Sequence, residues 1–156
     1  KGQLTVKPDN IILFSKFHES LVGNKEHLLL PAGEAQESFD YEGEIGIVIG
    51  KGGFNIPEDK AEKNILGFTL INDGSVRVWQ AHSLEAGKNF YRSGVCGPYI
   101  VTKDEIDKFN YIGFETRLNG KVVQRGNIRE MFFKLNQIIA YISVSYPKMR
   151  QFCDVI

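Results

Sequence analysis

Short apolar runs that end at glycines or polar residues recur along the chain, and this pattern is typical of strands. The longest such pattern lies between Asp40 and Gly50, where mostly β-branched residues follow Glu44. We expect a buried strand there and a neighbouring strand from Ile65 to Ile71. Shorter strands are predicted at residues 11–14, 27–30 and 95–101, the last of them interrupted by Gly97-Pro98.

A hairpin is predicted further along the chain. Residues 111–118 alternate in strand fashion, Asn119-Gly120 follows, and Lys121 opens a second short strand pattern. Because Asn and Gly both tolerate the left-handed backbone of a type I′ turn, this pair is a strong hairpin signal.

Helical patterns are fewer than strand patterns. Apolar residues at three- and four-residue spacing predict the longest helix over residues 131–142. A short surface helix is expected at 57–63, with proline in its first turn and acidic residues early. Residues 74–86 indicate a helical turn followed by a loop, and residues 102–105 have the spacing of a capping box. The fold class that follows is a strand-dominated α+β domain.

The length and composition suit one globular domain. The 156 residues are 42% hydrophobic and 24% charged, which is ordinary for a chain that buries a sizeable core. The chain stops at Asp154-Val155-Ile156 in the pattern of a strand that has just begun. We therefore expect a single domain over residues 1–156 that is incomplete at both ends.

Charge and cysteine content narrow the function classes. Nineteen basic residues balance nineteen acidic ones, so the chain lacks the positive net charge that would favour nucleic acid as a partner. No run of about 18 apolar residues is present, so no membrane span is expected. Two cysteines make neither a disulfide framework nor a metal-ligand pattern, which favours a reducing cytoplasm, with an organelle matrix as the alternative.

Three acidic residues are candidate metal ligands. Glu42 and Glu44 point to the same face of the predicted strand, because side chains alternate with a period of two. Asp73 follows the neighbouring strand and would reach the same point. Three converging carboxylates suit Mg²⁺, Mn²⁺ or Ca²⁺ better than zinc. Acids at a strand end are more often simply solvated, and spacing alone leaves both interpretations open.

Other polar residues near these acids have two interpretations each. Lys88 would bind a substrate oxyanion beside a metal, or it is a loop lysine in water. Gln80 would hydrogen-bond a substrate, or it lies on the surface. Arg77 would pair with a substrate carboxylate or with the acidic cluster. The three histidines share no useful spacing and are interpreted as surface or structural residues, namely His18, His27 and His82.

Five motifs in order resemble the fumarylacetoacetate hydrolase family, over about Phe14 to Ile156. Each motif is weak alone, but their shared order and spacing are specific. They are Asp40-Tyr41-Glu42-Gly43-Glu44, Asn72-Asp73-Gly74-Ser75-Val76-Arg77, Gly87-Lys88-Asn89-Phe90, Gly97-Pro98-Tyr99-Ile100-Val101-Thr102, and the run from Asn119 to Asn127.

The resemblance implies a fold, a metal and a site. The fold is the mixed β-sandwich roll of the family's catalytic domain, usually a homodimer. Glu42, Glu44 and Asp73 match the family's ligands for Mg²⁺, Mn²⁺ or Ca²⁺. Lys88 matches its active-site lysine, and Gln80 matches its substrate-contacting glutamine. On the predicted strand, Gly46 would give the ligand room on the face of the two glutamates.

The resemblance also implies small 2-oxo or 1,3-diketo acids as substrates, which chelate the metal. The leading hypothesis is C–C bond hydrolysis of an acylpyruvate-type acid. The alternatives on the same metal platform are an oxaloacetate-type decarboxylase and a keto–enol tautomerase or isomerase. A non-catalytic, metal-stabilised homodimer is the rival, because no histidine matches the family's histidine and Val78, Tyr91 and Ile128 depart from its pattern.

Overall fold

The computed structural model describes residues 6–145 and 153–155. Its main sheet has six strands in the order β1-β6-β4-β3-β10, with β7 also paired to β4. These strands are β1 (Leu21–Val22), β3 (Gly43–Ile49), β4 (Ile65–Asn72), β6 (Gly94–Cys96), β7 (Val101–Thr102) and β10 (Cys153–Val155). The pairing of β1 with β6 is parallel, and the other pairings of this sheet are antiparallel.

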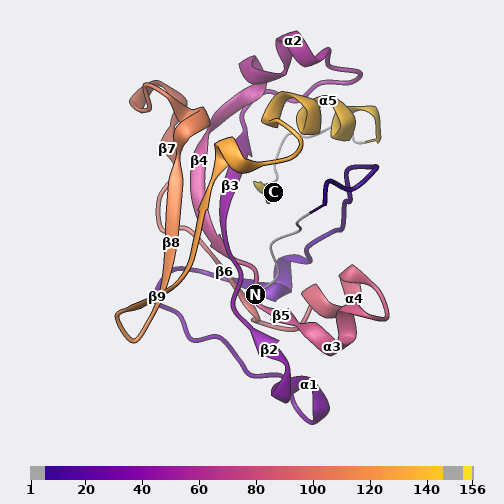
Figure 1. Ribbon diagram of the computed structural model, residues 1–156, viewed down its shortest axis with the longest axis vertical. Helices are drawn as coiled ribbons and strands as arrows, with labels where there is room; N and C mark the ends of the chain where they lie inside the picture. Colours follow the sequence, from indigo (N-terminus) through magenta and orange to yellow (C-terminus); the bar gives the residue numbers. More distant parts are fainter. Residues whose placement is uncertain (1–5, 146–152, 156) are drawn as a thin grey trace.

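Two smaller antiparallel sheets accompany the main one. The first joins β2 (Phe39–Asp40) to β5 (Ser75–Val76), and the second is the hairpin of β8 (Gly113–Leu118) and β9 (Lys121–Asn127). Figure 1 shows this hairpin running alongside β3.

The helices are short except for the last one. They are α1 (Glu34–Glu37), α2 (Glu58–Ala61), α3 (Arg77–Gln80), α4 (Leu84–Lys88) and α5 (Leu135–Ser145). Single 3₁₀ turns are η1 (His18–Ser20), η2 (Glu62–Asn64), η3 (Lys103–Glu105), η4 (Phe109–Tyr111) and η5 (Ile128–Glu130). No helix of the described residues is long and apolar enough to cross a membrane.

The core lies between β3 and α5. Ile45, Ile47 and Ile49 alternate along β3 and are buried in one cluster with the apolar face of α5. Burying an isoleucine side chain stabilises the folded state by roughly 1.5–3 kcal/mol. Figure 1 shows α2 and α5 side by side at one end of the long strands, whereas α3 and α4 lie at the other end. The core therefore anchors β3, and the first residues of β3 lie toward the end of the molecule that carries α3 and α4 (Figure 1).

Most of the predicted elements are confirmed. The two long strands form the antiparallel pair β3–β4, with Gly43 opposite Asn72 and Ile47 opposite Phe68. The hairpin turn has positive φ at both Asn119 (50°) and Gly120 (80°), as a type I′ turn requires. The predicted break at Gly97-Pro98 separates β6 from β7.

Two strand predictions are wrong. Residues 11–14 and 27–30 have no regular secondary structure. Ile12 and Leu30 are each more than 60% exposed. A four-residue apolar run forms a strand only where a neighbouring strand supplies backbone hydrogen bonds. Leu29 donates its N–H to the carbonyl of Arg92 across this otherwise irregular segment.

The balance and bounds of the helices also differ from expectation. Helical and strand residues occur in nearly equal numbers, so the fold is mixed rather than strand-dominated. The last helix begins at Leu135 instead of 131, because Gln137 accepts a hydrogen bond from the backbone N–H of Lys134 and fixes the start there. Thr102 precedes η3, but its side chain makes no capping hydrogen bond.

Candidate metal centre

The β3–β4 pair brings the three predicted carboxylates together. Asp73 lies one residue beyond β4, and its N–H donates to the carbonyl of Glu42 at 2.7 Å. Glu42, Glu44 and Asp73 each offer an oxygen, and these oxygens all lie within 4.8 Å of one another. They form the only such cluster of three metal-ligating side chains among the described residues. We call Glu42, Glu44 and Asp73 the acidic cluster.

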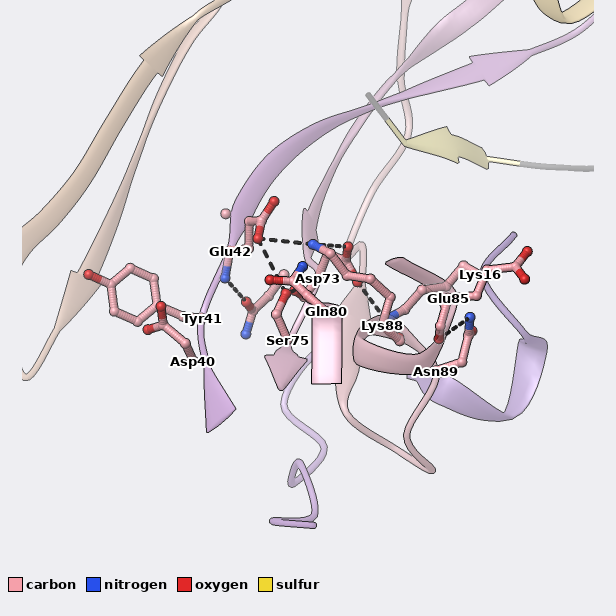
Figure 2. Close-up of polar contacts among 12 residues, drawn as sticks. Lys16, Asp40, Tyr41, Glu42, Asp73, Ser75, Gln80, Glu85, Lys88 and Asn89 are labelled. Atoms are coloured by element: carbon pink, nitrogen blue, oxygen red, sulfur yellow. Dashed lines mark hydrogen bonds and ion pairs between the residues drawn. The ribbon is translucent and has the colours of Figure 1, made fainter. Parts of the chain in front are cut away.

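Lys88 lies buried against the acidic cluster. Its Nζ is 2.9 Å from Glu42 Oε2 and 2.7 Å from Asp73 Oδ2, and its side chain is only 3% exposed. Figure 2 shows the ammonium group between these two carboxylates. The helix α4 that ends at Lys88 is capped by Ser83, whose Oγ accepts from the N–H of Ala86. The alternative of a loop lysine in water is therefore wrong.

A second lysine, which sequence reasoning missed, contacts the same aspartate. Lys16 Nζ is 2.5 Å from Asp73 Oδ1 and also donates to the backbone carbonyl of Lys88. Lys16 is separated from these partners by 57 and 72 positions in the chain. A buried aspartate requires a cationic or hydrogen-bonding partner, but nothing in the spacing indicates which lysine supplies it.

Arg77 pairs with the acids, which settles its open interpretation. Its Nη1 is 2.6 Å from Glu42 Oε2, and its Nε is 3.2 Å from Asp40 Oδ2. Arg77 Nη1 also donates to Gln80 Oε1 at 3.2 Å. Gln80 is half-buried and lies on the same short helix, so Arg77 links its amide to the acidic cluster.

The surroundings shift the pKa values of Glu42 and Glu44 in opposite directions. Burial, followed by the charges of Asp73 and Glu42, raises the pKa of Glu44 to about 8. Burial alone would also raise the pKa of Glu42, but Lys88 and Arg77 outweigh it and lower that pKa. Glu44 Oε2 is buried and has no hydrogen-bond partner among the described residues. Glu44 is therefore the carboxylate whose ionised form has the weakest support from the protein.

The space above Gly46 is filled by protein side chains. A Cβ atom at Gly46 would lie 2.8 Å from Ile71 Cδ1 and 2.9 Å from Thr69 Cγ2. The prediction that Gly46 leaves room for a ligand is therefore wrong, because side chains of β4 occupy the space next to this glycine.

The histidines and the departing positions lie outside the acidic cluster. All three histidines are exposed, and the ring of His82 contacts Trp79 with centroids 5.7 Å apart. Their interpretation as surface residues is confirmed. Tyr91 is 65% exposed, Val78 is 46% exposed, and Ile128 belongs to the hydrophobic core.

A mixed sheet that brings three carboxylates and two lysines together at one end is more typical of an enzyme site than of a binding module. Residues 3–150 match the family model described as fumarylacetoacetate (FAA) hydrolase C-terminal. The chain belongs to the fumarylacetoacetate hydrolase family.

Individual relatives agree with this assignment. The chain is 38% identical over 147 residues to the human protein named oxaloacetate tautomerase FAHD2A, mitochondrial, covering 92% of this chain and 46% of that protein. It is 37% identical over 140 residues to the mitochondrial oxaloacetate tautomerase fahd2 of Xenopus laevis, covering 87% of this chain and 43% of that protein. The chain thus spans about half the length of the curated relatives it matches.

Solved structures show the same fold. A 5-carboxymethyl-2-hydroxymuconate delta-isomerase from Mycobacterium smegmatis matches with a TM-score of 0.79 and 29% identity, covering 89% of this chain and 54% of that one. A fumarylacetoacetate hydrolase from Exiguobacterium antarcticum matches with a TM-score of 0.75 and 30% identity, covering 87% and 49%.

Proposed function

We propose that this chain is the catalytic unit of a divalent-metal-dependent keto–enol tautomerase that acts on a small 2-oxo acid of the oxaloacetate type. The observation that carries the proposal is the acidic cluster, with Lys88 buried against it. The named curated relatives add support, because both are called oxaloacetate tautomerases. This choice replaces C–C hydrolysis, the leading hypothesis from sequence, with one of its alternatives.

The residues fit a hard divalent cation. Carboxylate oxygens are the ligands that Mg²⁺, Mn²⁺ and Ca²⁺ prefer, and three of them converge here. Glu44 Oε2 is buried without a hydrogen-bond partner, and its pKa is raised by burial and by its acidic neighbours. A dication held by Glu42, Glu44 and Asp73 would remove that conflict. When bound, it supplies Lewis-acid stabilisation of enolate charge.

The balance of charge at the site suits an anionic substrate. With all groups ionised, the acids outnumber the cations by one charge. The acids are Asp40, Glu42, Glu44 and Asp73, and the cations are Lys16, Arg77 and Lys88. A dication reverses the sign and leaves one positive charge. Such a site attracts a dicarboxylate without making the resting protein strongly charged.

Lys88 and Gln80 are proposed to handle the substrate. Lys88 Nζ is held between Glu42 and Asp73, where it can give a proton to the enol carbon and regain one from the enol O–H, so that no net proton is gained or lost. Arg77 engages the carbonyl end of the Gln80 amide, which presents the amide N–H donors to a substrate oxygen. Tautomerisation moves one proton between carbon and oxygen and needs no attacking water.

The test is decay of enol-oxaloacetate absorbance with Mg²⁺ or Mn²⁺ and the full chain. Lys88→Met should lower the metal-dependent rate by about 100-fold or more, as loss of a general acid–base group does. Lys121→Ala, an exposed change in the hairpin, serves as the matched control. A rate for Lys88→Met equal to that of the control contradicts the proposal. No rate above the metal-only background in wild-type protein would favour the non-catalytic homodimer.

Hydrolysis of an acylpyruvate is the second candidate, because the matching family model is described as a hydrolase. The two reactions differ in mass balance. Hydrolysis adds water and breaks a C–C bond to release pyruvate, whereas tautomerisation conserves the mass of the substrate. Mass spectrometry of an acylpyruvate incubated with metal and protein separates them, and released pyruvate would favour hydrolysis.

The remaining expectations stay predictions. We expect the functional protein to be a homodimer, to use residues 1–156 as a single domain, and to act in the cytoplasm or an organelle matrix. The printed names of the human and Xenopus relatives place those two proteins in mitochondria.

A further inference from the structure

Gly43, between the two glutamates, makes an unusual contact with the hairpin. Its N–H donates to Gln124 Oε1 at 2.8 Å, and its carbonyl accepts from Gln124 Nε2 at 2.8 Å. One side-chain amide thus binds both backbone groups of one residue, as a neighbouring strand would. The two residues lie 81 positions apart in the chain.

The contact fills a specific gap along β3. On one edge, β4 pairs with the strand, and the carbonyl of Glu42 accepts from Asp73. On the other edge, the described residues of β10 pair with residues 46–48. Gly43 lies beyond that pairing, on the edge that Gln124 covers. The amide therefore holds the strand at the position where its two glutamates project.

The hairpin holds this amide in one orientation. Thr116 Oγ1 donates to Gln124 Oε1 at 3.0 Å from the paired strand β8. A Cβ atom at Gly43 would lie 2.1 Å from Thr116 Oγ1 and 3.1 Å from Gln124 Oε1, so only glycine allows this approach. We call Gly43, Thr116 and Gln124 the amide clamp.

We propose that Gln124 is a positioning residue that sets the spacing of Glu42 and Glu44 for the metal through the amide clamp. This inference rests on the proposed metal site. Glu42 and Glu44 flank Gly43 directly, so a rotation of the Gly43 peptide planes would move both carboxylates. Groups that orient metal ligands typically change metal affinity by about 10- to 100-fold when removed.

The test compares Gln124→Met with wild type in chelator-treated full chain. Methionine keeps the length of the side chain but removes both hydrogen bonds. We expect the Mn²⁺ dissociation constant to rise by about 10-fold, the Mn²⁺ electron paramagnetic resonance line shape to change, and the amide of Gly43 to exchange faster without metal. Val123→Ala, the neighbouring residue on β9, is the matched control and should alter none of the three.

The outcomes separate this inference from the proposed function. Wild-type protein without Mn²⁺ affinity overturns the metal site itself, while faster Gly43 exchange in Gln124→Met would still report the clamp. Unchanged affinity and line shape in Gln124→Met overturn the positioning role. If that variant does not fold, Thr116→Val replaces it, with an expected rise of about 3-fold in the dissociation constant because one of the three clamp hydrogen bonds is lost. An unchanged constant there also overturns it.

Discussion

The two faces of β3 show contrasting ways of building a protein interior. On one face, Ile45, Ile47 and Ile49 pack with α5 in a core that needs no partner beyond other apolar side chains. On the other face, Glu42 and Glu44 meet Asp73, and cations from distant parts of the chain pair with Glu42 and Asp73. The first face contributes stability, whereas the second gathers acidic groups whose charge is only partly compensated, because Glu44 Oε2 is buried without a hydrogen-bond partner among the described residues. Such conflicts are typical of functional sites.

The largest effect is expected from Asp73→Asn, which should lower both the stability of the fold and the affinity for Mn²⁺. The change removes the negative charge that pairs with Lys16 and Lys88 in a buried site. Breaking a buried ion pair costs about 3–5 kcal/mol of folding free energy. The change also removes a predicted metal ligand, so Mn²⁺ binding should be lost. Urea unfolding and calorimetric titration measure the two effects. The exposed Asp59→Asn is the control, and an Asp73→Asn protein with normal Mn²⁺ affinity would refute the ligand assignment.

Ile47→Ala should affect stability alone. Ile47 is 2% exposed in the core, and truncating a buried isoleucine costs about 2–5 kcal/mol. Because its side chain points away from the acidic cluster, the Mn²⁺ dissociation constant of the folded variant should stay within about 2-fold of wild type. A large loss of Mn²⁺ affinity at a temperature where the variant is folded would show that the two faces are not separable.

Glu44 should make the metal-free protein less stable as pH rises. Its pKa is raised to about 8 in the folded protein, against 4.5 for an ordinary glutamate, so the folded state holds this proton more tightly than the unfolded chain. The contribution is fully present below about pH 4.5 and is lost as pH rises towards 8. The slope can reach about 1.4 kcal/mol per pH unit. Thermal unfolding across this window should show the decline in wild type, a flatter profile in Glu44→Gln, and recovery on adding Mn²⁺.

Equal pH profiles for chelator-treated wild type and Glu44→Gln would contradict this assignment. The lowered pKa of Glu42 does not produce the same trend, because its contribution is lost below about pH 4.5, outside the window.

The smallest effect is expected from Lys16→Met. Removing this ammonium group makes the acidic cluster more negative, so Mn²⁺ should bind several-fold more tightly, on the order of 1 kcal/mol. Binding of the dianion oxalate to the metal-loaded protein should weaken by a similar factor. Calorimetry with each ligand tests the opposed directions. A parallel loss of both affinities would mean that Lys16 acts mainly by holding Asp73 in place.

The same contrast explains what the sequence could predict. The period-two pattern places Ile45 and Ile47 on one face and Glu42 and Glu44 on the other, and Asp73 follows from the next strand. Lys16 could not be found in this way, because a buried ion pair depends on chain segments that meet only in the folded protein. The strand predictions for the apolar runs near Ile12 and Leu30 were wrong for a related reason. Their hydrophobicity is local, but strand formation needs a partner.

The most direct test of the account is a calorimetric titration of Mn²⁺ into chelator-treated full chain, with and without oxalate, which mimics a chelating enolate. We expect Mn²⁺ binding that oxalate strengthens, and loss of both effects in Glu44→Gln. Mn²⁺ binding that oxalate leaves unchanged would indicate a structural ion, and no Mn²⁺ binding in wild type would contradict the proposal that Glu42, Glu44 and Asp73 form a metal site.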